Sequence, residues 1–272
     1  MNSLKNSIKN ILWKFWLYRG IKSLKKTDPL QAKIRCAIAE TIRPAIGQEA
    51  KGRIREIEQL RNRFAQDETP VIVTDYGAGN PDSRRSENEM QQGFSQTATY
   101  GDISLGSKPA LWAFLLFNLI KIFQPLRALE LGTCIGISAS YQATAQKLNG
   151  KGRLITIEGS EAIAALARKN IRSLQLDNVE VVCGRFKDVL PAVLQDNQPF
   201  DCVFIDGHHD EQATIDYFEM ILPALSSGAL LIFDDISWSV GMKNAWQKIS
   251  CDERIALAVD LKMLGLCLIR VP

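Results

Sequence analysis

The chain is poor in histidine, and its cysteines form no pattern. Its two histidines, His208 and His209, are neighbours, and its six cysteines include no C-x-x-C pair, which excludes the usual zinc-ribbon and dithiol redox motifs. No cleavable signal pattern is visible, and no apolar run approaches the roughly 20 residues that span a bilayer. We therefore expect a cytoplasmic protein with reduced, mostly buried thiols.

The net charge of +3 hides an uneven distribution. Residues 1–66 carry 15 basic and 5 acidic residues, whereas the remainder carries 18 basic and 25 acidic residues. A length of 272 residues is ample for one large core. We predict a basic helical extension over 1–66, a connecting segment or lid over 67–106, and one catalytic domain over 107–272.

The first 26 residues contain seven bases, no acids and a cluster of aromatic residues that predicts a short helix. Such a helix can lie on an anionic membrane surface. The alternative, which we favour, is that Trp13, Phe15 and Trp16 pack on the catalytic domain or on a second subunit. Residues 30–65 are predicted to be helical with a solvated, charged face, and none of the standard nucleic-acid-binding motifs occurs.

Residues 71–81 (VIVTDYGAGNP) combine a strand-like run with a glycine-rich turn. The polar stretch that follows has no amphipathic helix close behind it, which argues against a dinucleotide loop. We interpret the segment as a turn or lid that faces the active site through Tyr76, Arg84 or Arg85. A helix is predicted from Ser107, with Pro109 near its start.

From residue 127 onward, strand-like and helix-length segments alternate. This alternation predicts a doubly wound, Rossmann-like α/β fold with a seven-stranded, mostly parallel sheet. The last two runs are separated by a short gap, which predicts a C-terminal antiparallel hairpin. The predicted strands cover about 127–132, 153–158, 179–184, 201–206, 228–234, 254–261 and 264–271.

The first of these strands runs into the sequence ALELGTCIGIS, an acid followed by a glycine turn and a helix. Glycine lets the backbone press against a ligand, and Glu130 can accept hydrogen bonds or face a cation. The next strand ends in Glu158, which is placed to hold the two hydroxyls of a ribose. The two strand ends together predict a cofactor with an adenosine moiety.

Carboxylates follow two further strands of the predicted sheet. Asp206 ends the fourth strand, and Asp234 and Asp235 end the fifth. Strand ends of an open α/β sheet share one edge, so we expect the three side chains to meet and to bind a hard cation such as Mg²⁺. The adjacent His208 and His209 are candidates for a general base, because a neutral imidazole accepts a proton near physiological pH.

The ordered motifs ALELGTCIGIS, LITIEGS, VVCGRFKDVLP, FIDGHHD and LLIFDDISW resemble the class I S-adenosylmethionine (SAM)-dependent methyltransferases. The resemblance is to the metal-dependent branch typified by catechol O-methyltransferase, and it covers roughly residues 100–272. In that family the metal ligands are Asp, Asp and Asn and the base is commonly a lysine. Here Asp235 replaces the Asn and His209 stands at the position of the lysine.

The resemblance implies a role for each matching residue. Residues of the first turn would flank the methionine part of SAM, Glu158 with Gly159 would bind the ribose, and Phe186 and Lys187 would line the adenine. Asp206, Asp234 and Asp235 would bind the metal, and His209, with His208 beside it, would be catalytic. The implied cofactor-binding set is Glu130, Gly132, Thr133, Gly136, Ser138, Glu158, Gly159, Phe186, Lys187 and Asp206.

These observations predict a SAM-dependent methyltransferase that transfers a methyl group, assisted by Mg²⁺ or another divalent cation, to a hydroxyl of a small molecule. The departures from the family pattern leave a natural product, a sugar or an aromatic compound as acceptor. The alternatives are a membrane-associated enzyme acting on a lipid-linked acceptor and a non-catalytic SAM-binding regulator. A nicotinamide-dependent oxidoreductase is disfavoured, because the turn lacks the third glycine. We expect no nucleic-acid partner, and we expect peripheral membrane contact through residues 1–26 or a homo-oligomer as alternatives.

Overall fold

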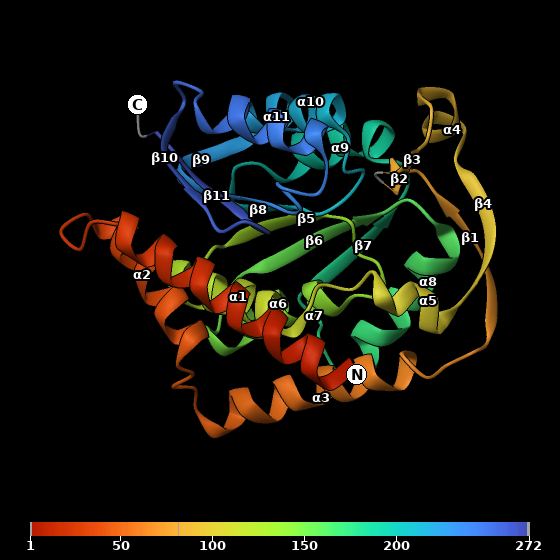
Figure 1. Cartoon of the computed structure of the whole chain (residues 1–272), viewed down its shortest axis with the longest axis horizontal. Helices are drawn as coiled ribbons and strands as arrows, with labels where there is room; N and C mark the ends of the chain where they lie inside the picture. The colour runs from red at the N-terminus through yellow and green to blue at the C-terminus, as the bar shows by residue number, and fades with distance from the viewer. Residues whose placement is uncertain (1, 81, 271–272) are drawn as a thin grey trace.

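A seven-stranded sheet forms the centre of the computed structural model, which describes residues 2–80 and 82–270 (Figure 1). The strand order is β10-β11-β9-β8-β5-β6-β7, and only β11 runs antiparallel to its neighbours. The predicted fold class is confirmed, including the C-terminal hairpin. The strands are β5 (Arg127–Leu131), β6 (Arg153–Glu158), β7 (Val179–Cys183), β8 (Phe200–Ile205), β9 (Leu225–Phe233), β10 (Ile255–Asp260) and β11 (Gly265–Ile269).

The central strands are apolar on both faces because each face is covered by helices. In β8, Cys202 and Phe204 belong to one buried cluster, while Val203 and Ile205 belong to the other. This alternation follows from the two-residue period of a strand. Burial on both faces explains why the sequence shows continuous apolar runs here rather than an apolar–polar alternation.

The helices form two layers around this sheet, as Figure 1 shows. The layer beside β8 and β9 consists of α9 (Phe186–Asn197), α10 (Glu211–Ile221), the 3₁₀ turn Leu222–Ala224 and α11 (Val240–Ser250). The opposite layer consists of α6 (Ala110–Phe123), α7 (Ile137–Leu148) and α8 (Glu161–Ser173), with α1 (Asn2–Ser23), α2 (Pro29–Ile42) and α3 (Gln48–Phe64) outside it. The helix expected from Ser107 is α6, which begins after Pro109.

The N-terminal helix α1 packs on the catalytic domain through part of its aromatic cluster. The rings of Trp13 and Trp112 meet edge to face, 5.9 Å between centroids, and Leu17 is fully buried. Phe15, in contrast, is 55% exposed. Packing on the catalytic domain is thus observed for Trp13, whereas membrane or subunit contact of the exposed face stays a prediction. Among the described residues, no helix combines the length and apolar character that crossing a bilayer requires.

The region predicted as one charged helical stretch, 30–65, is two helices, because residues 43–47 between α2 and α3 contain Pro44 and Gly47. The face of α3 is only partly solvated. Arg61 pairs with Glu58 at 3.0 Å, but Ile57 and Leu60 are buried against the core. The helix therefore contributes to stability through apolar burial as well as through its ion pairs.

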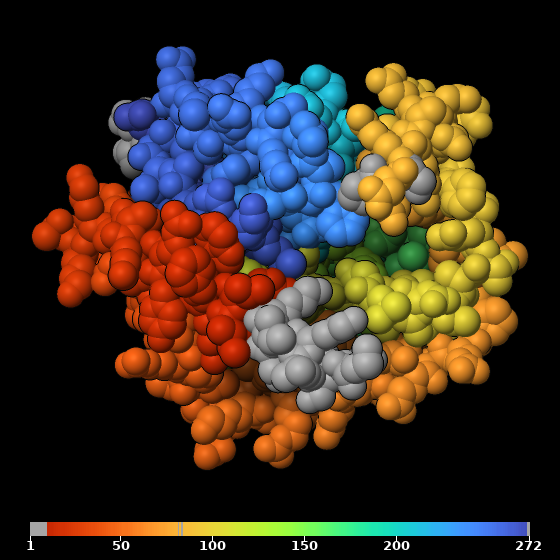
Figure 2. All heavy atoms as spheres, viewed as in Figure 1, coloured from red at the N-terminus to blue at the C-terminus, as the bar shows by residue number. Residues whose placement is uncertain are grey.

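The segment between the extension and α6 folds into an antiparallel ribbon with a small lobe at its tip. In Figure 2 the golden lobe stands beside the blue C-terminal half of the chain. A helix within the polar stretch was missed, although Ser86 and Glu89 form a capping box that is readable as Ser-x-x-Glu. The elements are β1 (Pro70–Asp75), β2 (Gly79–Asn80), β3 (Ser83–Arg84), α4 (Glu87–Gln92), β4 (Phe94–Thr99) and α5 (Tyr100–Leu105).

Candidate active site

The glycine turn after β5 sits against the end of β8. Gly132 has φ of 99°, and a Cβ built on it would lie 1.8 Å from the carbonyl oxygen of Asp206. The Asp206 amide also donates to the carbonyl of Leu131 at 2.8 Å. The glycine thus lets the turn approach a neighbouring strand end closely, and the predicted approach to a ligand stays a prediction.

A cavity of about 810 Å³ opens at this edge of the sheet. Its volume is within the range of small-molecule and cofactor sites, and its position is where ligands of open α/β sheets bind. The residues from the predicted cofactor set that line it are Gly132, Thr133, Ser138, Glu158, Gly159, Phe186, Lys187 and Asp206. Four segments far apart in the sequence thus meet around one space.

Backbone amides fix the carboxylate of Glu158 at the end of β6. Its carboxylate accepts hydrogen bonds from the amides of Cys134 at 2.9 Å and Ser160 at 3.0 Å. Burial raises the pKa of Glu158 to about 7, although these amide bonds act to lower it. A fixed carboxyl group that lines the cavity suits the predicted role of binding two ribose hydroxyls.

Two residues of the predicted cofactor set lie outside the cavity lining, and the prediction is corrected for both. Glu130 is fully buried beneath the turn, where it accepts hydrogen bonds from Gln142 at 3.0 Å and Thr156 at 2.7 Å. Burial raises the pKa of Glu130 to about 7. Gly136, with φ of 87°, starts α7 and faces Ile171 of α8. Both residues support the turn and do not face the cavity.

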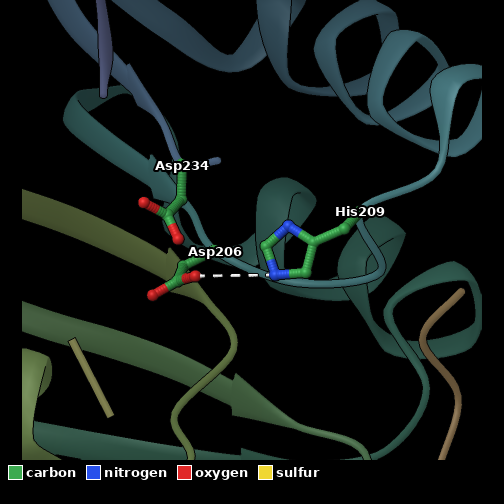
Figure 3. Close-up of side chains that lie close together, drawn as sticks. All are labelled: Asp206, His209 and Asp234. Atoms are coloured by element: carbon green, nitrogen blue, oxygen red, sulfur yellow. Dashed lines mark ion pairs between the residues drawn. The ribbon is translucent and has the colours of Figure 1, made fainter. Parts of the chain in front are cut away.

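The structure brings two of the three predicted metal ligands together. Figure 3 shows Asp206, His209 and Asp234 turned toward one another, and one potential ligand atom from each lies within 4.8 Å of the others. Asp235 is not part of this cluster, which corrects the predicted set. It follows Asp234 in a turn with φ of 50°, and successive residues leaving a strand point to different sides.

Lys108, which the sequence analysis did not single out, completes this cluster. Its ammonium contacts the carboxylate of Asp234 and lies 3.2 Å from that of Asp206. The side chain is buried, with 6% exposed, just before α6. No local signal marked it, because an isolated lysine before an apolar helix is ordinarily a surface residue.

The buried charges of Lys108, Asp206 and Asp234 shift one another's pKa values. Although burial opposes it, the carboxylates of Asp206 and Asp234 raise the pKa of Lys108, so the ammonium stays charged. Burial and the negative charge of Asp234 raise the pKa of Asp206 well above its usual range. Burial also acts to raise the pKa of Asp234, but the charge of Lys108 and the contacts with Asp206 and His209 together outweigh it, and the net shift is downward. Lys108 and Asp234 are therefore the ion pair at the centre of the cluster.

The donor set of this cluster does not fit a resident divalent cation. Asp235 is absent from it, and an ammonium already contacts both remaining carboxylates. Neither Asp234 nor Asp235 lines the cavity, whereas Lys108 and Asp206 do. Mg²⁺ requires near-octahedral oxygen ligation, and a second cation beside Lys108 would be repelled.

The two histidines have different surroundings. The Nδ1 atom of His208 is hydrogen-bonded to the hydroxyl of Tyr217 at 2.8 Å, and burial lowers the pKa of this imidazole. The Nε2 atom of His209 lies 3.9 Å from Asp206, and both imidazoles line the cavity. His209 is therefore the histidine placed beside the charged cluster, and His208 is anchored by Tyr217.

Part of the segment over 67–106 lines the cavity, and its role as a lid stays a prediction. The amide of Ala78 donates to the carbonyl of His208 at 2.7 Å, and the ring of Tyr76 lies against Gly159. Tyr76 and Arg85 line the cavity, whereas Arg84 does not line it and is ion-paired with Asp210, which does. This segment is thus tied to the same loop that carries the histidines.

Residues 129–236 match a family model described as "Methyltransferase domain". This span runs from β5 to the turn after Asp235 and so contains every predicted strand-end residue of the site. Together with the sheet order and the cavity, the match shows that this part of the chain is similar to class I SAM-dependent methyltransferase domains.

Among known proteins, the chain is similar to enzymes named O-methyltransferases. It is 36% identical over 120 residues to a protein from Niastella koreensis named catechol O-methyltransferase, a match that covers 43% of this chain and 52% of that protein. It is 28% identical over 110 residues to a protein-L-isoaspartate O-methyltransferase from Thermotoga maritima, with 40% and 32% covered. The chain thus spans about half or less of these relatives, and it resembles the catechol O-methyltransferase-like branch.

Solved structures agree with this assignment of the fold. The O-methyltransferase TomG from Streptomyces achromogenes, described in complex with SAM, superposes with a TM-score of 0.53 at 25% identity, covering 62% of this chain and 82% of TomG. An O-methyltransferase from Bacillus cereus has a TM-score of 0.53 at 22% identity, with 89% of this chain and 100% of that chain covered. The latter likeness supports the fold alone.

Proposed function

We propose that the protein catalyses transfer of a methyl group from SAM to a hydroxyl oxygen of a small molecule. The observation that carries this proposal is that one cavity is lined both by Glu158, the carboxyl group placed to bind a ribose, and by His209 and Asp206 of the charged cluster. The similarity to proteins named O-methyltransferases supports the choice of oxygen as the methyl acceptor.

The cavity is divided between the two ligands by its lining. Glu158 and Gly159, at the end of β6, would face the adenosyl moiety together with Phe186. Lys108, Asp206 and His209 mark the polar end, where the acceptor hydroxyl would lie. Methionine and tyrosine side chains also line the cavity, which favours a small acceptor with an apolar or aromatic body.

The residues perform binding, orientation and proton transfer. SAM, when bound, supplies an electrophilic methyl group on a sulfonium. Glu158 would hold the ribose hydroxyls, and the lid through Tyr76 would exclude water from the cavity. The Nε2 atom of His209 would accept the hydroxyl proton of the acceptor, because a neutral imidazole is a competent base near neutral pH. Tyr217 would keep His208 from turning into the same space.

The sequence analysis also predicts Mg²⁺ in this reaction. The cluster found in the structure is Asp206, His209 and Asp234, without Asp235. Metal dependence therefore stays a prediction. The residue roles given above need no step that passes through a metal ion.

The proposal is tested with purified full-length protein, radiolabelled SAM and a panel of hydroxylated acceptors that includes catechol. We expect labelled, acceptor-dependent product. His209→Gln is expected to lower kcat by roughly 10²- to 10⁴-fold with SAM affinity unchanged, as for loss of a general base. Glu158→Gln is expected to weaken SAM binding by about 10- to 100-fold, as for loss of hydrogen bonds to a charged acceptor.

The matched control is Glu161→Gln. Glu161 is an exposed glutamate in the first turn of α8, three residues beyond Glu158, and does not line the cavity. It should leave SAM affinity and turnover unchanged. A protein that binds SAM but methylates no acceptor in the panel would support the non-catalytic alternative instead.

A further inference from the structure

The charged cluster already contains a cation that belongs to the chain. Lys108 contacts Asp234, lies 3.2 Å from Asp206, and has 6% of its surface exposed. An ammonium has three N–H donors and no acceptor. Two are directed to the two carboxylates. The side chain also lines the cavity, so the third donor is available to a ligand there.

We propose that Lys108 takes the place of the divalent cation in this site. It forms the ion pair with Asp234, contacts Asp206 and donates a hydrogen bond to the acceptor oxygen, so that methyl transfer by this chain needs no metal ion. This inference rests on the proposed function, since it assigns the group that stabilises the reacting oxygen.

The step balances without any further reactant. A lone pair of the acceptor oxygen forms the new O–C bond while the S–C bond breaks, and that electron pair stays on sulfur as S-adenosylhomocysteine leaves. The hydroxyl proton passes to His209. Lys108 keeps its proton throughout and stabilises the negative charge that develops on the oxygen, as a fixed donor in a site with little water does.

Accessibility favours the lysine over a metal ion as the group that meets the acceptor. Asp234 is 2% exposed and does not line the cavity, whereas Lys108 does. Asp235, the third expected ligand, is outside the cluster. Lys108 and His209, in contrast, line the cavity and lie 3.3 and 3.9 Å from the same Oδ1 atom of Asp206.

Removal of Lys108 should open the cluster to a metal. One oxygen of Asp234, Oδ1, is buried with no hydrogen-bond partner among the described residues. Without the ammonium, two carboxylates would lie together with no counter-charge, which is the arrangement that binds divalent cations. A gain of metal binding on loss of a lysine is the signature that separates this proposal from a merely structural ion pair.

The test titrates Mn²⁺ into the full-length protein with S-adenosylhomocysteine present and follows free Mn²⁺ by electron paramagnetic resonance. For the wild type we expect Mn²⁺ to stay free and turnover to be the same in EDTA and in Mg²⁺. Lys108→Met should bind Mn²⁺, keep its affinity for S-adenosylhomocysteine, and lose kcat by roughly 10²- to 10³-fold. Lys108→Arg, which keeps the charge, should recover part of that loss.

The matched control is Lys147→Met, which breaks another lysine–aspartate pair. Lys147 lies 2.9 Å from Asp177 on the surface, away from the cavity, and its loss should change neither Mn²⁺ binding nor turnover. If Lys108→Met fails to fold, the double variant Lys108→Met with Asp234→Asn removes both charges together. It should fold, bind S-adenosylhomocysteine, bind no Mn²⁺, and show the same loss of kcat.

Stoichiometric Mn²⁺ binding by the wild type, with turnover abolished by EDTA, would overturn the proposal. Full turnover in the folded double variant would overturn it as well. If no acceptor is methylated by any form of the protein, the proposed function fails. In that case the Mn²⁺ titrations of the wild type and of Lys108→Met still decide whether the lysine excludes a metal.

Discussion

Replacement of Gly132 by alanine tests whether the first turn is shaped by the chain itself or by its ligand. The residue has φ of 99°, and an added Cβ would lie 1.8 Å from the carbonyl oxygen and 2.8 Å from the carbonyl carbon of Asp206. Those atoms are backbone at the end of β8, so they cannot rotate away. The turn or the strand end must move to admit the methyl group.

The expected cost has two parts. A left-handed backbone costs a residue with a Cβ about 1 to 2 kcal/mol. Overpacking in a dense interior adds about 1 to 3 kcal/mol, so the free energy of unfolding should fall by about 2 to 5 kcal/mol. Gly150 is the control, because its φ is 70° and nothing lies within 4 Å of an added Cβ. Gly150→Ala should therefore cost only the first part.

The assay is urea-induced unfolding of the full chain, followed by circular dichroism, for the wild type and both variants. Binding of S-adenosylhomocysteine is measured separately. We expect Gly132→Ala to lose clearly more stability than Gly150→Ala. Equal losses in the two variants, with cofactor affinity reduced only in Gly132→Ala, would refute the reasoning, because the glycine would then serve the ligand and not the contact between strand ends.

Two further predictions concern buried groups away from the reacting atoms. Burial raises the pKa of Glu130 from 4.5 to about 7, so the folded state holds a proton that the unfolded state releases, and stability falls as pH rises through this window. In the wild type this loss of unfolding free energy should reach up to roughly 3 kcal/mol between pH 4.5 and 7, and Glu130→Gln should remove it. Urea unfolding at both pH values measures the difference, and an equal pH dependence of stability in the variant and the wild type would contradict the prediction. Trp13→Ala should lower the free energy of unfolding by about 2 kcal/mol because it uncovers Trp112. Phe15→Ala, at an exposed site, should lower it by about 0.5 kcal/mol or less. Equal midpoints of thermal unfolding for the two variants would count against packing of α1 on the domain.

The sheet and the strand-end residues could be predicted because they follow from local periodicity. Each strand is a short apolar run, and the residue that ends it must lie at the shared edge, so the sequence predicts that Glu158, Asp206 and Asp234 lie at one edge. Which direction each side chain takes at that edge depends on turn dihedrals. For that reason the sequence did not separate Asp234 from Asp235 or place Glu130 beneath the turn.

Lys108 lay beyond sequence reasoning for a different reason. It precedes the first strand of the sheet by almost 20 residues, and its partners Asp206 and Asp234 follow about 100 and 126 residues later. Only the tertiary arrangement of α6 beside β5 and β8 brings it to them. The place of the segment over 67–106 could not be predicted for a similar reason. The hydrogen bond from the Ala78 amide to the His208 carbonyl joins backbone groups far apart in the sequence, and no local motif encodes it.

Helix α6 connects the charged cluster of the candidate active site with the site at which α1 packs on the domain. Lys108 lies just before the start of this helix. Four residues further on, in its first turn, the ring of Trp112 contacts that of Trp13. Lys108 and Trp112 therefore lie about one helical turn apart at the same end of α6, so the contact with α1 is made close to the buried ammonium. The seating of α1 on Trp112 and the position of the Lys108 ammonium thus share one turn of backbone, although no described residue of α1 lines the cavity.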